Sequence, residues 1–200
     1  RYNTALNLGR LKKLKNVFRQ FHNYGIDYRI VKGFAIALRI GSLGYRVMGD
    51  VDIVVQERDL TRSIFILLNS GFRDKFESKC HDYALPSRIN KLTLINEDGV
   101  EIDLHVAERA FPSDIFRGMF KVKARYMPFE DLQLSIPNDD YLIRHSALHG
   151  VQFSSITDRW QTLIDIKAID DLKEGKTLIT SIMIGGAFIN SLSDLRKYMT

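Results

Sequence analysis

The stretch Gly49–Val55 reads GDVDIVV, with two aspartates at the start of an otherwise apolar and β-branched segment. This composition predicts a strand. Residues two apart in a strand point to the same face, so Asp50 and Asp52 project together while the apolar side chains between and after them face a core. The stretch therefore predicts a partly buried strand that presents a pair of carboxylates.

A later segment repeats this arrangement. Lys91–Asn96 and Val100–Val106 flank Glu97-Asp98-Gly99, and an Asp-Gly pair between two apolar runs is a strong hairpin signal. One face of the second strand is apolar and the other polar, the polar positions being Glu101, Asp103 and His105. Asp103 thus has the polarity needed to complete a three-carboxylate site with Asp50 and Asp52.

Acidic side chains in an apolar strand are costly without a compensating partner. A divalent cation is a natural partner, because carboxylate oxygens suit Mg²⁺ or Mn²⁺. The alternative is that Asp50 and Asp52 lie at the solvent end of the strand, with Asp50 capping a turn. Upstream, Lys32-Gly33 lies at an expected strand-to-helix junction, where glycine lets backbone N–H groups approach a phosphate.

The whole pattern predicts an α/β (α+β) fold, a small mixed sheet flanked by helices with a helical carboxy-terminal part. We expect a core over residues 1–130 and a helical region over 131–200. Helical spacing covers Leu6–Tyr24, Phe34–Ile40, Leu60–Asn69, Tyr141–His149 and Trp160–Leu172, and Tyr28–Val31 is a further expected strand.

The 200 residues carry a net charge of +5 and a pI of about 9.3, which suits an anionic partner without identifying it. The basic surface of the first helix is either solvated or a nucleic-acid contact. A single cysteine, Cys80, excludes an internal disulfide and predicts a cytoplasmic location. No membrane partner is expected, because Leu178–Leu192 is interrupted by glycines and too short to span a bilayer.

The ordered motifs Val31-Lys32-Gly33, Arg46, Gly49–Val55 and Glu101–His105 resemble those of the nucleotidyltransferase superfamily, which has the DNA polymerase β-like fold. The chain is most similar to its uncharacterised group with Lys-Gly, Asp-x-Asp and Asp-Leu-His motifs. The resemblance spans residues 28–172 and continues through His145, His149, Trp160 and Asp165. It departs from most of the superfamily at Lys32-Gly33, where Gly-Gly or Gly-Ser is usual.

This resemblance implies the nucleotidyltransferase fold and transfer of a nucleoside monophosphate from an NTP, such as ATP, to an acceptor hydroxyl with release of pyrophosphate. Mg²⁺ (or Mn²⁺) would be the cofactor in a two-metal mechanism. Asp50, Asp52 and Asp103 would be both catalytic and metal-binding. The nucleotide would bind at Lys32, Gly33, Arg46 and Gly49, and His105 is a candidate substrate contact.

Several alternatives stay open. A small-molecule acceptor is favoured over RNA or protein, and a non-catalytic nucleotide-binding module is a third reading. Lys32 and Arg46 could be surface residues, and His105 a buried structural histidine. His145 and His149, one helical turn apart, either face the cleft or pack in the core. We expect acceptor choice to lie in the carboxy-terminal helices and the Phe111–Phe129 loop region.

Overall fold

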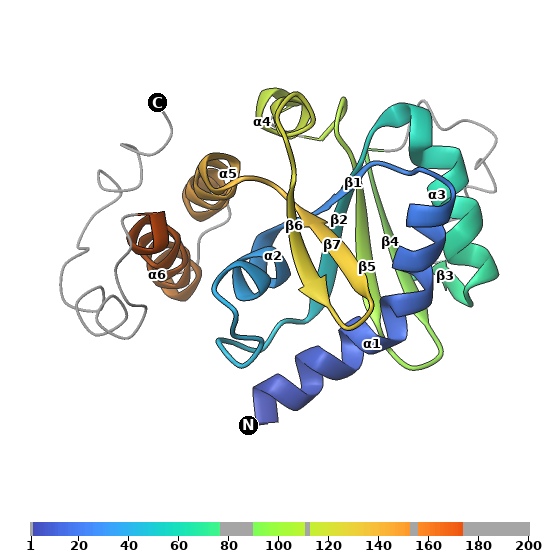
Figure 1. Ribbon diagram of the computed structural model, residues 1–200, viewed down its shortest axis with the longest axis horizontal. Coiled ribbons are helices and arrows are strands. Elements are labelled where there is room, and N and C mark those ends of the chain that lie inside the picture. The colour runs from blue at the N-terminus through green and yellow to red at the C-terminus, as the bar shows by residue number, and fades with distance from the viewer. Residues whose placement is uncertain (1, 77–89, 111–112, 153–155, 174–200) are drawn as a thin grey trace.

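The computed structural model describes residues 2–76, 90–110, 113–152 and 156–173 (Figure 1). At its centre is a five-stranded sheet in the order β1-β2-β5-β4-β3. β2 and β5 run side by side in parallel, and the other three pairings are antiparallel. The strands are β1 (Tyr28–Ile30), β2 (Asp50–Val55), β3 (Phe72–Asp74), β4 (Lys91–Asn96) and β5 (Glu101–Val106).

Two helices, α1 (Tyr2–Asn23) and α3 (Glu57–Asn69), pack together against one face of the sheet. Phe18 and Phe21 of α1 contact the ring of Tyr28, with ring centroids 5.4 and 5.5 Å apart. Tyr28 pairs with Val55 in the β1–β2 ladder, and directly paired residues share a face. The main core therefore lies on the Val55 face of the sheet, opposite Asp50 and Asp52.

The carboxylate face has a smaller apolar cluster at one end. Val54 shares this face with Asp50 and Asp52, and it belongs to a cluster with Val31, Phe116 and Met119. Phe116 lies in the short helix α4 (Ser113–Gly118). α4 thus packs on the Val54 end of this face, and neither Asp50 nor Asp52 belongs to the apolar cluster that it forms there.

The remaining elements pack beside the sheet. α2 (Lys32–Arg39) contacts both α5 (Asp139–Gln152) and α6 (Ile156–Lys173), which pack against each other (Figure 1). β6 (Arg125–Phe129) and β7 (Leu132–Ile136) form a separate hairpin next to β1. Asp139 joins three elements, because Arg39 binds it through Nε at 2.7 Å and Nη2 at 2.9 Å, and Arg125 through Nη2 at 3.1 Å.

Most expected elements are confirmed. The strand over 50–55 has the predicted bounds, and the Asp-Gly segment joins an antiparallel pair, with Gly99 at φ +73°. The helices begin two to four residues before the predicted starts. Treating Phe111–Phe129 as a loop was wrong in its described part, which contains α4 and β6. The division at residue 130 stays a prediction.

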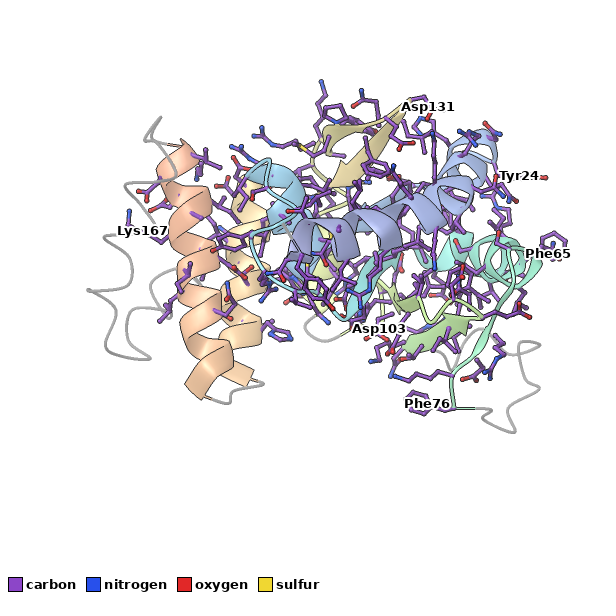
Figure 2. All side chains as sticks on the ribbon, turned by 90° about the horizontal axis from the view of Figure 1, so that it is seen from below. Tyr24, Phe65, Phe76, Asp103, Asp131 and Lys167 are labelled. Atoms are coloured by element: carbon purple, nitrogen blue, oxygen red, sulfur yellow. The ribbon has the colours of Figure 1, made fainter. Side chains whose placement is uncertain are left out.

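Some features bear on the surface of the molecule. Phe65 and Phe76 are exposed and project outward (Figure 2).

Within the described residues, no helix combines the length and apolar character needed to cross a membrane. Cys80 and Leu178–Leu192 lie outside the described residues, so the cytoplasmic location stays a prediction.

Candidate functional site

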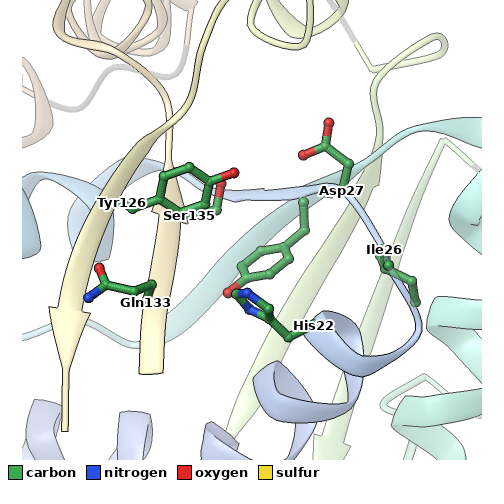
Figure 3. Close-up of a pocket in the computed structure, with 8 residues that line it drawn as sticks. His22, Ile26, Asp27, Tyr126, Gln133 and Ser135 are labelled. Carbon is green, nitrogen blue, oxygen red and sulfur yellow. The ribbon is translucent and has the colours of Figure 1, made fainter. Parts of the chain in front are cut away.

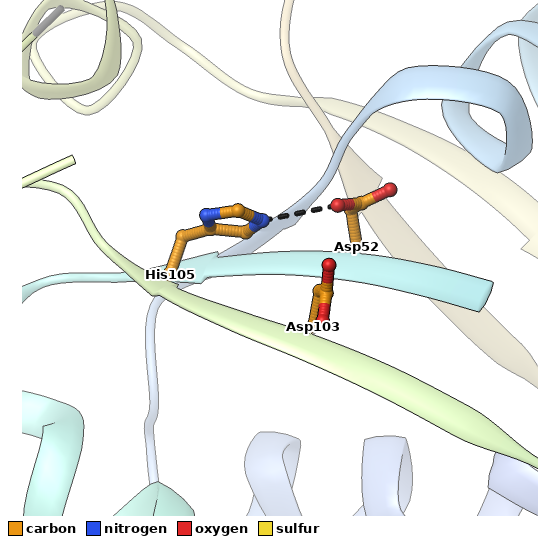
Figure 4. Close-up of side chains that lie close together, drawn as sticks. All are labelled: Asp52, Asp103 and His105. Carbon is orange, nitrogen blue, oxygen red and sulfur yellow. Dashed lines mark hydrogen bonds and ion pairs between the residues drawn. The ribbon is translucent and has the colours of Figure 1, made fainter. Parts of the chain in front are cut away.

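The parallel pairing of β2 with β5 places Asp52 directly opposite Asp103. Both carboxylates are buried, with only 4% and 5% of each residue exposed. His105, two residues further along β5, lies on the same face (Figure 4). One ligand atom from each of these three residues lies within 4.8 Å of the others, so the sheet gathers them into a compact cluster.

Two side chains, those of His105 and Lys32, contact the Asp52 carboxylate. His105 Nε2 lies 3.0 Å from Asp52 Oδ1, and the Lys32 ammonium donates to the same oxygen. Burial alone would raise the pKa of Asp52. The hydrogen bond from His105 and the charge of Lys32 outweigh that effect and lower the pKa to about 2. Asp52 is therefore ionised across the physiological pH range.

Asp103 is held by a different pair of residues, both from β4. Thr93 Oγ1 donates to Oδ1 at 2.6 Å, and Lys91 Nζ donates to Oδ2 at 2.8 Å. Burial lowers the pKa of Lys91. The hydrogen bond to Asp103 and the charges of the surrounding carboxylates raise it by more, so the net shift of this pKa is upward. Each of the two buried aspartates thus has its own lysine.

Asp50 stands slightly apart from this cluster. It lies at the start of β2, opposite Glu101, and is only partly buried. Burial and the charge of Asp52 both raise its pKa. Lys32 acts in the opposite direction but does not cancel these effects, so the net shift of the Asp50 pKa is upward.

The residues present fit a hard divalent cation. Two buried carboxylates face each other across adjacent strands, and a third lies close enough to affect them electrostatically. Oxygen donors of this kind suit Mg²⁺ or Mn²⁺. Among the described residues, Asp52, Asp103 and His105 are the one group whose ligand atoms lie close enough together for a shared ion.

The segment Lys32-Gly33 begins α2 directly beside the carboxylates. The backbone N–H of Val31 donates to the Asp52 carbonyl at 3.0 Å, which fixes the strand-to-helix junction against β2. Lys32 has a φ of +53°, in the left-handed region that costs a non-glycine residue about 1–2 kcal/mol. Tertiary contacts therefore hold Lys32 in this conformation.

Arg46 lies against Gly33. A Cβ at Gly33 would be 2.7 Å from Arg46 Nη2, so glycine makes room for the guanidinium. The buried Arg46 Nε has no hydrogen-bond partner among the described residues, and Nη2 lies 3.6 Å from Asp165 Oδ2. Burial raises the pKa of Asp165. The guanidinium keeps unused donor capacity beside the start of α2. Gly49, just before β2, has open space around its Cα.

A cavity of about 70 Å³ lies between α2, α5 and α6. His145 and His149 both line it, together with Lys32, Arg46 and Asp165. His145 is also buried, so the two histidines share a cavity with two of the expected nucleotide contacts. Burial lowers the pKa of His145 to about 3, so this histidine is neutral near pH 7.

Phe116 links the carboxylate cluster to this cavity. Its ring stacks on His105 with centroids 6.0 Å apart and meets His145 edge-on at 5.0 Å. One phenyl ring therefore packs against both histidines, His105 in the carboxylate cluster and His145 in the small cavity.

A larger cavity of about 540 Å³ lies elsewhere, between the α1–β1 turn and the β6–β7 hairpin (Figure 3). Tyr28 lines it from the core face of the sheet. Its other lining residues include Asp27, Tyr126, Gln133 and Ser135. None of the residues considered above as carboxylate, lysine or nucleotide contacts lines it. Size alone thus does not mark the site where chemistry-bearing side chains converge.

The structure brings most of the expected site residues together. Asp52, Asp103 and His105 form one cluster and Lys32 contacts Asp52, with Asp50 and the Gly33–Arg46 pair beside them. The sequence reasoning missed Lys91 and Thr93. Their signal was the period-two alternation of the first hairpin strand, which places both on the face of Asp103 once the register is known.

Comparisons with known proteins cover most of the chain. A family model described as uncharacterised nucleotidyltransferase matches residues 1–174. A search of curated proteins finds no match. The fold is similar to that of the lincosamide antibiotic adenylyltransferase LnuA in its lincomycin-bound form, at 15% identity and a TM-score of 0.52, covering 80% of this chain and 96% of that one.

Two further solved structures are similar. An antigenic nucleotidyltransferase-like protein from Paracoccidioides brasiliensis has 16% identity and a TM-score of 0.56, with 96% of this chain and 92% of that one covered. ANT(2")-Ia in complex with adenylyl-2"-tobramycin has 10% identity and a TM-score of 0.58, with 96% and 99% covered. At these identities the likeness shows a common fold.

Proposed function

Because this chain belongs to the family of uncharacterised nucleotidyltransferases, we propose that it transfers a nucleoside monophosphate from an NTP to a hydroxyl of a small-molecule acceptor. The observation that carries the proposal is the pairing of Asp52 with Asp103 across β2 and β5, with Asp50 beside them. Buried carboxylates that face one another repel each other. Lys32 and Lys91 each offset one of the two, but Asp50 adds a third carboxylate, whose pKa is raised by burial and by the charge of Asp52, and a divalent cation would offset this further negative charge.

Asp50, Asp52 and Asp103 would hold the divalent cations, Mg²⁺ or Mn²⁺. Bound metal at such a site supplies charge neutralisation for the triphosphate and makes an acceptor hydroxyl more acidic. His105, through its hydrogen bond at 3.0 Å, keeps the Asp52 carboxylate oriented and ionised. This is an orienting role, and contact of His105 with the substrate remains part of the proposal.

The triphosphate would lie at the start of α2. Backbone N–H groups of a helix amino terminus favour anions, and Gly33, which has no side chain, lets the Arg46 guanidinium lie against this end of the helix. Lys32 and Arg46 would supply positive charge, the latter through its unpaired buried Nε. Gly49, with open space around it, would let the chain before β2 approach the nucleotide.

In the transfer, the acceptor oxygen forms a bond to the α-phosphorus while the bond from that phosphorus to the bridging oxygen breaks. Pyrophosphate leaves, and the acceptor proton passes to solvent or to a nearby base. Such a reaction depends mostly on positioning and charge stabilisation. The residues above provide both without a covalent intermediate.

The acceptor is proposed to be a small molecule. LnuA and ANT(2")-Ia, which share the fold, are described with lincomycin and adenylyl-2"-tobramycin, both small molecules. The basic residues of α1, which favoured RNA, largely have acidic partners within the chain. Lys12 and Lys15 pair with Glu130, Lys13 with Asp98, and Arg19 with Asp131. We propose that the helical region after residue 130 faces the acceptor.

A thermal-shift panel of ATP, GTP, CTP and UTP with Mg²⁺ or Mn²⁺ tests the site. Binding raises apparent stability by about 2.7 kcal/mol at a hundredfold excess over Kd. We expect a metal-dependent shift with at least one NTP that is absent in Asp50→Ala/Asp52→Ala. Pyrophosphate release with a panel of small hydroxylated acceptors then tests turnover. A nucleotide shift without turnover on small molecules, RNA or protein would favour the non-catalytic reading.

A further inference from the structure

Lys32 is fixed beside Asp52 by its own backbone. The preceding residue, Val31, donates its N–H to the Asp52 carbonyl at 3.0 Å, so the two segments are joined at this point. Lys32 then adopts a φ of +53°, and its ammonium lies on Asp52 Oδ1 with a quarter of the side chain exposed. A lysine in this conformation depends on its surroundings, so the contact with Asp52 is part of the native arrangement.

The ammonium occupies the side of Asp52 that belongs to the ligand cluster. Lys32 and His105 both contact Oδ1 of Asp52, and Asp52 belongs to the group whose ligand atoms lie within 4.8 Å of one another. A divalent cation bound by that group would lie a few ångströms from the positive charge of Lys32. The two cations repel each other strongly in a buried site, where the effective dielectric constant is far below that of water.

Nucleotide phosphates offer Lys32 another partner. The start of α2 and the Arg46 guanidinium lie beside it, and both favour an anion. A lysine side chain has a long flexible stem, so its ammonium can move several ångströms while its backbone stays in place. A triphosphate bound there would draw the ammonium away from Asp52.

We propose that Lys32 is an internal cation that competes with metal for Asp52, so that tight metal binding requires a nucleotide. This inference rests on the proposed function for its nucleotide half, whereas its metal half concerns the protein alone. It predicts positive coupling between metal and nucleotide, which is reciprocal for any two linked ligands. It also assigns a role to the lysine that stands where most of the superfamily has a glycine.

The test is Mn²⁺ binding measured from the loss of the free-ion EPR signal, without nucleotide and with a non-hydrolysable ATP or GTP analogue. Lys32→Met removes the charge, and Lys32→Gly also relieves the backbone conformation, so at least one variant should fold. Lys32→Arg retains the charge. Lys75→Met is the matched control, because Lys75 pairs with Glu101 on β5 outside the cluster.

We expect both uncharged variants to bind Mn²⁺ at least about tenfold more tightly without nucleotide, because removing one neighbouring positive charge favours the dication. Lys32→Arg and Lys75→Met should match wild type, and the nucleotide should tighten Mn²⁺ binding less in the uncharged variants. Equal or weaker Mn²⁺ binding by both uncharged variants would overturn the inference. Failure of the proposed function would look different, since wild type would then show no nucleotide-dependent binding or turnover whatever Lys32 does to Mn²⁺.

Discussion

Asp52 and Asp103 face each other across two parallel strands, yet no hydrogen-bonding partner is common to both carboxylates among the contacts described. Asp52 is bound by His105 and by Lys32 from α2, whereas Asp103 is bound by Thr93 and Lys91 from β4. The two acids therefore have separate partners, although His105 lies on the same strand as Asp103. Each acid can be altered while the contacts of its neighbour stay in place.

Asp52→Asn should lower nucleotidyl transfer by about a hundredfold or more while the protein stays folded. The substitution keeps the shape of the side chain but removes a charge that metal and phosphate chemistry requires. Steady-state pyrophosphate release, with circular dichroism to verify folding, provides the measurement. Asp98→Asn is the control, because Asp98 is an exposed acid paired with Lys13. Equal activity of the two variants would contradict the assigned role of Asp52.

Asp50→Asn should stabilise the metal-free protein and still impair activity. Burial and the charge of Asp52 raise the pKa of Asp50, so its ionised form is less favourable in the fold than in the unfolded chain. That penalty is present at neutral pH and disappears as pH falls below the raised pKa. Solvent screening limits the gain to below about 1 kcal/mol, which corresponds to about 2–4 °C at most for a chain of this size.

Thermal melts of wild type and Asp50→Asn in EDTA at pH 7 and pH 4 measure this effect. The difference between the two proteins should shrink at the lower pH, where wild-type Asp50 becomes protonated. A variant that melts below wild type at pH 7 would show that Asp50 has a stabilising partner in the fold.

His145 should make the protein sensitive to mild acid. Burial lowers its pKa to about 3, whereas the unfolded residue titrates near 6.5. Between these values the unfolded chain binds more protons than the folded one, so stability is fully present above about 6.5 and is lost as pH falls toward 3. His145→Gln should flatten that loss. Urea unfolding of both proteins from pH 7 to pH 4.5 is the measurement, and parallel pH curves would contradict a buried neutral histidine.

The contribution of Asp139 to the free energy of unfolding should depend more on Arg39 than on Arg125. Arg39 is largely buried and binds both carboxylate oxygens, whereas Arg125 makes one contact and is 42% exposed. We expect Arg39→Ala to cost about 1.5–3 kcal/mol in free energy of unfolding and Arg125→Ala less than about 1 kcal/mol. Double-mutant cycles with Asp139→Asn in chemical denaturation measure both couplings, and a larger coupling for Arg125 would reverse the assignment.

The alternation of apolar and acidic residues was enough to predict β2, β5 and the common face of Asp50, Asp52 and Asp103. A period-two pattern determines which face a side chain occupies, but it does not determine which strands are neighbours. Lys91 and Thr93 were missed for that reason, because only the β4–β5 register places them against Asp103. β6 and α4 were missed because Pro128 interrupts the first and the second is only six residues long.

The parallel pairing of β2 with β5 also constrains how the protein reaches its native state. His105 and Asp52 touch although 53 residues separate them in the chain, so their meeting requires closure of a long loop. Contacts of such high sequence separation slow folding. A cation that needs both strands cannot bind before they pair, so it would favour the native protein over the unfolded chain.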